Sequence, residues 1–235
     1  MDPQYEEALN LVSVGAGKIV SALGGAFAGA GVAFWFQNRR ENKIKRNAQF
    51  EALVRAQHAL YFMWSVVAGL RYKYLDESRT DPKRHRMLRI NWLPEHHVPI
   101  DFNALTFLHR QGSTTLLTQL YVAERAYLSA IDAVRERNQL VFRAIPTPDK
   151  EYQFDPKSKL LGMRVDPLMD SLLESATTAL YHSVDGGMSR CEDAFAELRK
   201  AAKRMFPKNK PFLRDENLTK DGFFASHGQK APADN

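Results

Sequence analysis

The sequence predicts an all-α protein in which a single N-terminal transmembrane helix is followed by an antiparallel bundle of three long helices. Three observations carry this prediction: an uncharged, glycine-rich stretch near the start, apolar residues spaced three and four apart over most of the remainder, and prolines between the periodic segments. The chain has 235 residues, 44% apolar and 26% charged, which suffices for a folded core. Its single cysteine excludes an internal disulfide framework and a cysteine-based zinc site.

The transmembrane prediction rests on the stretch from Ile19 to Phe36, which contains no charged residue. At 1.5 Å per residue it is about 27 Å long, close to the hydrocarbon thickness of a bilayer. Three aromatic residues end it, five basic residues follow within positions 39–46, and acidic residues precede it. The positive-inside rule therefore places the N-terminus outside and the C-terminal body in the cytoplasm, at the cell inner membrane. The expected divisions are a short external N-terminus (1–10), a transmembrane helix (11–37), a cytoplasmic helical bundle (38–206) and a flexible C-terminal tail (207–235).

Two alternatives to a membrane anchor remain open. Ala26-Phe27-Ala28 resembles a signal-peptide cleavage site, but signal peptides begin with a basic region and this chain begins with an acidic one. The other alternative is an apolar helix buried in a hairpin, which is disfavoured because the apolar run ends in aromatic and then basic residues. The anchor is the favoured interpretation.

Small residues recur at every fourth position of the predicted span, which places them along one stripe of a helix. Lipid provides no hydrophobic drive for helix association, so membrane helices associate where small side chains let the backbones approach. Glycine and alanine are also common in spans that do not associate. The favoured interpretation is a homo-oligomer whose contact face comprises Gly17, Ser21, Gly25, Gly29 and Ala33.

The rest of the chain predicts three helices. Apolar periodicity indicates a first helix over residues 50–74, and three prolines indicate a long irregular connection over residues 76–103. A second helix is expected from Ser113, as N-cap, to Ala144. A third is expected from Asp166-Pro167 to the residue before Pro207, with a bend or break at Gly186-Gly187.

An up-down-up order of these helices brings three basic segments to the end of the bundle far from the membrane. Basic residues often end helices because they compensate the helix dipole, but this accounts for one or two residues per helix and not for so many. A cationic pole attracts polyanions, so the expected partner is a nucleotide, a nucleic acid or an acidic protein. The residues expected to bind it are Arg71, Lys73, Lys83, Arg84, Arg86, Arg89, Arg110, Lys200, Lys203 and Arg204.

Candidate chemistry is sparse. His96 and His97 are adjacent in an extended segment, where neighbouring side chains point to opposite sides, so they are poorly placed to bind one metal ion. Cys191 lies on an apolar stripe and is expected to be buried. Glu124 is flanked by apolar residues at helical spacing and is expected at the edge of the core. No catalytic residue, metal site or cofactor is expected.

One spacing resembles that of an enzyme class. Helical-bundle ribonucleases of the HEPN class use an arginine and a histidine four to six residues apart, and Arg79 and His85 have this spacing. The resemblance covers seven residues, and Pro82 interrupts the segment where that class has a helix-associated turn. It implies a HEPN-like ribonuclease as a lesser alternative.

The expected function is that of a small membrane effector that assembles through its span, the architecture of bacterial antiviral and stress effectors. A signal at the cationic pole would alter the assembly, with a pore as one outcome. The alternative is a non-enzymatic scaffold or adaptor that holds a partner at the membrane. The two interpretations differ in whether the protein changes membrane permeability.

Overall fold

The computed structural model describes residues 3–87, 93–94, 96–144, 166–207 and 218–226, and within residues 3–30 it describes the backbone only. All regular elements in these ranges are helical, which confirms the all-α prediction. The chain divides into two compact units, residues 1–49 and residues 50–235.

The first unit is formed by the first part of helix α1 (Pro3–Leu70). Every side chain from residue 31 to residue 48 is exposed. Among them are Phe34, Trp35 and Phe36, with exposed fractions of 71%, 55% and 60%. This part of α1 therefore presents large apolar side chains that pack on nothing within the unit.

Among the residues whose side chains the structure describes, no helix has a stretch long and apolar enough to cross a bilayer. The predicted span over residues 11–37 falls mostly outside this set, because side chains are described from residue 31 onward. The transmembrane helix therefore stays a prediction.

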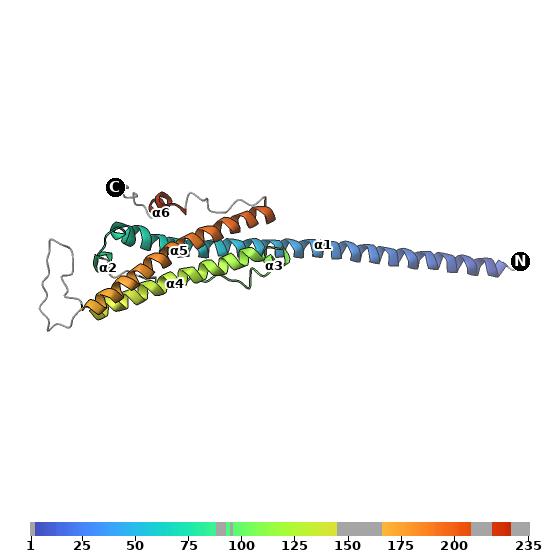
Figure 1. The fold of residues 1–235 in the computed structure, drawn as a ribbon. Helices are drawn as coiled ribbons and strands as arrows, with labels where there is room; N and C mark the ends of the chain where they lie inside the picture. The colour runs from blue at the N-terminus through green and yellow to red at the C-terminus, as the bar shows by residue number, and fades with distance from the viewer. Residues whose placement is uncertain (1–2, 88–92, 95, 145–165, 208–217, 227–235) are drawn as a thin grey trace. The chain divides into compact units, whose positions relative to one another are not determined.

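The second unit is a helical bundle, as predicted, built from the last part of α1 together with α4 (Thr114–Ala144) and α5 (Pro167–Met205). Helices α4 and α5 lie side by side (Figure 1). Helix α4 begins after Ser113, and α5 begins at Asp166-Pro167 and ends before Pro207, as the sequence predicted. Helix α5 continues through Gly186-Gly187 without a break. The shorter elements are η1 (Arg71–Leu75, a π-helical turn), η2 (Asp76–Ser78, a 3₁₀ turn), α2 (Arg84–Met87), α3 (Phe107–Arg110) and α6 (Lys220–Ser226).

The core forms because each long helix of this unit has one apolar stripe. On α1 the stripe includes Leu53, Leu60, Trp64 and Val67, none of which is exposed to solvent, and their spacing of three to seven residues keeps them on one face. Buried side chains of α4 and α5 complete the same cluster, among them Leu120, Val134, Leu180, Val184 and Phe195. The bundle therefore encloses a core within a single chain.

Helix α1 runs antiparallel to α5. Phe50 meets Phe206 at the end of α5, with ring centroids 5.3 Å apart. Further along α1, the indole Nε1 of Trp64 donates a hydrogen bond of 3.1 Å to Glu192 Oε1. Residue numbers thus rise along α1 as they fall along α5.

Helix α4 also runs antiparallel to α5. Arg204 near the end of α5 donates to Ser113 Oγ, just before the start of α4. At the other end, Arg137 Nε donates to Thr177 Oγ1. Helices α1 and α4 are therefore parallel to each other, and the predicted up-down-up order of the three helices was wrong.

The connection between α1 and α4 explains this arrangement, because it runs the length of the bundle. His85 contacts Asp170 near the start of α5. The chain then returns along α4, where His97 Nε2 lies 3.0 Å from Glu124 Oε1 and the same oxygen accepts the Ile100 backbone N–H at 3.1 Å. About 14 extended residues match the roughly 47 Å of a 31-residue helix, so the connection is long enough to run along the bundle without turning locally.

Helices α4 and α5 lie close together at Gly187. A Cβ added to Gly187 on α5 would lie 3.4 Å from the Ala126 carbonyl oxygen and 3.7 Å from Ala130 Cβ on α4. A Cβ on neighbouring Gly186 would meet nothing within 4 Å. A Cβ at position 187 would therefore be in ordinary van der Waals contact with α4, whereas one at position 186 would face open space.

Part of the predicted C-terminal tail is folded. Helix α6 buries Phe223 and Phe224, whose exposed fractions are 1% and 5%. Phe223 packs edge-on against Trp64, with centroids 6.2 Å apart, and both phenylalanines contact Tyr72. The expectation of a loose tail was wrong for residues 218–226, because this aromatic pair adds to the core.

Candidate functional site

The residues predicted to form a cationic pole lie in two separate groups. Arg86 contacts Asp170 near the start of α5, whereas Arg204 lies near its end beside Ser113. These two positions on α5 are 34 residues apart, about 50 Å at 1.5 Å per residue. Arg89 lies outside the described residues. The predicted pole is not assembled, because it depended on the helix order that the structure contradicts.

Most cations of the first group are engaged within the chain. Arg79 Nη2 donates to both carboxylate oxygens of Asp185, at 2.7 and 2.9 Å. Arg71 lies 3.7 Å from each of Asp185 and Asp76. The hydrogen bond to Asp185 is the main reason that the pKa of Arg79 is raised above its usual value. These contacts attach the end of α1 and the following turn to α5.

Tyr181 is the centre of this attachment. Its hydroxyl donates to the Leu75 carbonyl oxygen at 2.8 Å, so the Ser78 hydroxyl, 3.2 Å away, is left to donate to the tyrosine. The guanidinium groups of Arg79 and Arg84 lie over its ring, at 5.4 and 4.6 Å from the centroid. Both contacts lie within the range of cation–π attraction.

Asp170 anchors the next turn. Its carboxylate accepts two hydrogen bonds from the Arg86 guanidinium and one from His85 Nε2 at 3.0 Å. These partners hold the pKa of Asp170 below its ordinary value, with the Arg86 hydrogen bond as the largest cause. The side chain of Asp170 is 24% exposed and that of His85 is 7% exposed.

Arg137 is a fully buried arginine on α4. Its Nε donates to Thr177 Oγ1 at 3.3 Å and its Nη2 to the His85 carbonyl oxygen at 3.5 Å. Burial lowers the pKa of Arg137 to about 10, because a charged guanidinium loses hydration there. Arg137 therefore joins α4, α5 and the α2 turn from the inside.

These interactions form a clamp that holds the connection against α5; we call it the connection clamp, comprising Arg71, Asp76, Arg79, Arg84, His85, Arg86, Arg137, Asp170, Tyr181 and Asp185. The geometry gives the ribonuclease interpretation no support. Arg79 is held by Asp185, and His85 is buried with its Nε2 on Asp170. A general base for RNA cleavage must reach the substrate hydroxyl, and a histidine with 7% exposure is poorly placed to do so.

The clamp predicts a pH-dependent contribution of Asp170 to stability. Because the folded-state pKa of Asp170 is depressed, its stabilisation is fully present above the unfolded-state pKa of about 3.9 and is lost as the pH falls through the folded-state value. We expect Asp170→Asn to lower the free energy of unfolding by about 1–2 kcal/mol at pH 6. That difference from the wild type should shrink as the pH falls below about 3.9 and then through the depressed folded-state pKa of Asp170.

Urea unfolding at pH 3, 4 and 6 measures this effect. Asp132→Asn is the matched control, because Asp132 forms an exposed pair with Arg135 and is itself 71% exposed, so its loss should cost less than about 0.5 kcal/mol at every pH. A cost of Asp170→Asn that is the same at all three pH values would contradict the assigned pairing.

The remaining candidate residues are buried or pair with neighbouring side chains. His97 stacks on Tyr127, with centroids 5.4 Å apart, and pairs with Glu124, whose side chain is 12% exposed. Burial raises the pKa of the Cys191 thiol to about 12, so the thiol stays protonated at neutral pH. In the described ranges, no cluster of three or more metal-ligating side chains is present.

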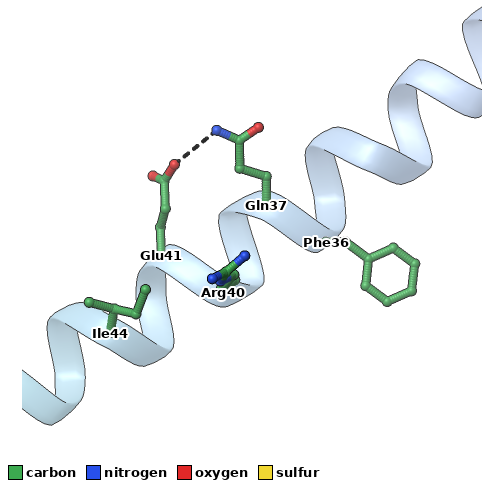
Figure 2. A pocket seen from close by; sticks show the side chains of 5 residues that line it. All are labelled: Phe36, Gln37, Arg40, Glu41 and Ile44. Carbon is green, nitrogen blue, oxygen red and sulfur yellow. Dashed lines mark hydrogen bonds between the residues drawn. The ribbon is translucent and has the colours of Figure 1, made fainter.

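The second candidate region is the exposed part of α1 that follows the predicted span. Here Arg39 Cζ lies 5.4 Å from the centroid of the Trp35 ring. A shallow open hollow on this one helix is lined by Phe36, Gln37, Arg40, Glu41 and Ile44 (Figure 2). Of the predicted oligomerisation residues, Ala33 is exposed, whereas only the backbone is described for Gly17, Ser21, Gly25 and Gly29.

Four residues of the clamp were not predicted from the sequence, namely Asp170, Asp185, Tyr181 and the buried Arg137. Their partners are 40 or more residues away in the chain, so no local spacing indicates them. No protein-family model, curated protein or solved structure matches this chain.

Proposed function

We propose that this chain is a single-pass membrane protein that self-associates through the glycine-rich segment of α1 and acts as a membrane effector. In this proposal residues 11–37 span the inner membrane, the N-terminus is outside and the bundle is cytoplasmic. The observation that carries it is the exposure of Val32, Phe34, Trp35 and Phe36 on a helix that directly continues an uncharged stretch. A helix with apolar residues on all sides needs lipid or a partner.

Two further observations support the proposal. Residues 3–70 form one uninterrupted helix, so the glycines of the predicted stripe lie in helical backbone as the stripe requires. The bundle closes its core without a second copy of the chain, so we assign self-association to the predicted span.

The structure changes one part of the expected mechanism. A cationic pole that senses a polyanion is not assembled, and several of its residues hold the connection clamp together instead. The proposed effector therefore has no sensor at that pole, and its activity depends on the assembly of the membrane spans.

A scaffold or adaptor is the second candidate, and one observation favours it. Phe142, Leu168 and Leu172, near the end of α4 and the start of α5, have exposed fractions of 60%, 67% and 44%. Exposed apolar side chains gathered at one place are typical of partner-binding surfaces. A scaffold would bind a partner here without altering the membrane.

The test pairs self-association with permeability. In Gly25→Leu/Gly29→Leu, two bulky side chains occupy the small-residue stripe, and we expect the oligomer in detergent to fall to a monomer and ion leakage on overexpression to be abolished. The matched control is Gly24→Leu/Gly31→Leu, because at about 100° per residue these two residues lie about 120° and 140° around the helix from the midpoint of Gly25 and Gly29. This control should retain both properties.

The outcomes separate the two candidates. If the stripe variant loses both association and leakage and the control variant keeps both, the effector is supported. Association without leakage in the wild type supports the scaffold. A wild-type protein that is monomeric in detergent would overturn self-association through the span.

A further inference from the structure

The exposed part of α1 after residue 36 has most of its positive charge on one side. At about 100° per residue, Arg39, Arg40, Lys43 and Arg46 fall within an arc of about 120° of the helix circumference, and Phe36 lies in the same arc. All four basic side chains are exposed. We call these four residues the basic face.

The other side of the helix differs in chemistry. Glu41, the only acidic residue between positions 31 and 50, lies about 160° from the centre of the arc and accepts a hydrogen bond of 3.1 Å from Gln37 Nε2. Figure 2 shows Gln37 and Glu41 together on one side of α1, away from Phe36. Asn42 donates to Asn38 at 3.2 Å, also outside the arc. Lys45 is the one basic residue on this side.

This asymmetry needs an explanation beyond membrane orientation. The positive-inside rule depends on how many basic residues follow a span and not on which face of the helix they occupy. Trp35 and Phe36 stand at the start of the basic face, and Arg39 packs over the Trp35 ring at 5.4 Å. Aromatic rings at the interface with cations one turn beyond match the depth order of acyl chains and phosphate groups in a bilayer.

We propose that the basic face is a binding site for the headgroups of anionic phospholipids in the cytoplasmic leaflet. The inference rests on the proposed function, because it requires the preceding residues to be in the membrane. Guanidinium and ammonium groups donate to the phosphate oxygens, while Phe36 enters the upper acyl region. The side with Glu41 and the amides faces away from the lipid surface, because a carboxylate would repel it.

The experiment measures which lipids the full-length protein retains. The protein is reconstituted in vesicles of phosphatidylcholine with one-fifth phosphatidylglycerol, extracted in mild detergent, and its bound lipids are quantified by mass spectrometry. Because each cation near the surface favours an anionic lipid, four cations should make phosphatidylglycerol most of the retained lipid, close to the fivefold enrichment that is the maximum for a one-fifth share. The enrichment should fall in high salt, because salt screens exposed charges.

The variant is Arg39→Gln/Arg40→Gln/Lys43→Gln/Arg46→Gln, for which we expect no enrichment. The control Arg55→Gln/Arg110→Gln/Arg190→Gln/Lys203→Gln removes the same charge from exposed residues of the bundle and should keep the wild-type enrichment. Circular dichroism verifies that both remain helical.

Three results would overturn the inference: no enrichment in the wild type, unchanged enrichment in the basic-face variant, or an equal loss in the control. Each of these leaves the membrane proposal standing as long as the wild-type protein requires detergent for extraction. Extraction without detergent would instead refute the proposed function.

Discussion

Trp64→Ala should lower the free energy of unfolding of the bundle by about 3–5 kcal/mol. Trp64 has no exposed surface, and its ring contacts Tyr61 and Phe223 at centroid distances of 6.0 and 6.2 Å. Truncation removes these contacts, leaves a cavity among α1, α5 and α6, and deprives Glu192 of its indole donor. Urea unfolding of the full-length protein in mild detergent, followed by near-ultraviolet circular dichroism, measures the loss.

Trp35→Ala provides a matched control for this prediction. The same residue type is replaced in the same helix, but Trp35 is 55% exposed and lies in the other unit. We expect no change in the unfolding of the bundle. Equal stabilities of the two alanine variants would show that the core is not built around Trp64.

Arg137→Ala is the second substitution with a large expected effect, a loss of about 3–4 kcal/mol. It removes a fully buried side chain, together with its donors to Thr177 Oγ1 and the His85 carbonyl oxygen. The α2 turn should then detach from α4 before the rest of the bundle unfolds. Hydrogen exchange of the His85–Met87 amides, compared with amides in the middle of α5, detects that opening.

Arg137→Met should cost less than Arg137→Ala. Methionine fills most of the space, and it removes a charge whose burial is unfavourable, as the lowered pKa of about 10 indicates. Arg135→Ala, two residues away in an exposed pair with Asp132, should cost less than about 0.5 kcal/mol. A methionine variant less stable than the alanine variant would contradict this view of Arg137.

Local signals in the sequence were sufficient to locate the long helices of the bundle. Ser113 precedes α4, Pro167 is the first residue of α5 and Pro207 follows its end. Prolines mark these ends because they act on the backbone next to them, whereas Asp166 makes no side-chain capping hydrogen bond. Apolar periodicity located the core face of α1 for the same reason.

The order of the helices could not be predicted from such signals. It depends on whether the segment after α1 turns locally or crosses the bundle, and this is decided by contacts between residues distant in sequence. His97 and Ile100 bind Glu124 from 27 and 24 residues away. Glu124 was expected at the edge of the core, and its burial agrees with that, but its partners gave no local pattern.

The same limitation explains the error about the cationic pole. Counting Arg and Lys by segment does not reveal that Asp185 and Asp170 on α5 pair with Arg79 and Arg86, which are 106 and 84 residues away. The folded part of the tail did have a signal, since Phe223-Phe224 is an adjacent aromatic pair in an otherwise polar segment, and such a pair is rarely left in water.

The central claim is that the glycine-rich part of α1 lies in lipid, and extraction of the full-length protein from cell membranes tests it most directly. Membranes are washed with high salt and then with alkaline carbonate, which release peripheral proteins, before detergent is added. We expect the protein to stay in the pellet through both washes and to enter the supernatant only with detergent. Recovery of most of the protein in the first aqueous supernatant would contradict the claim.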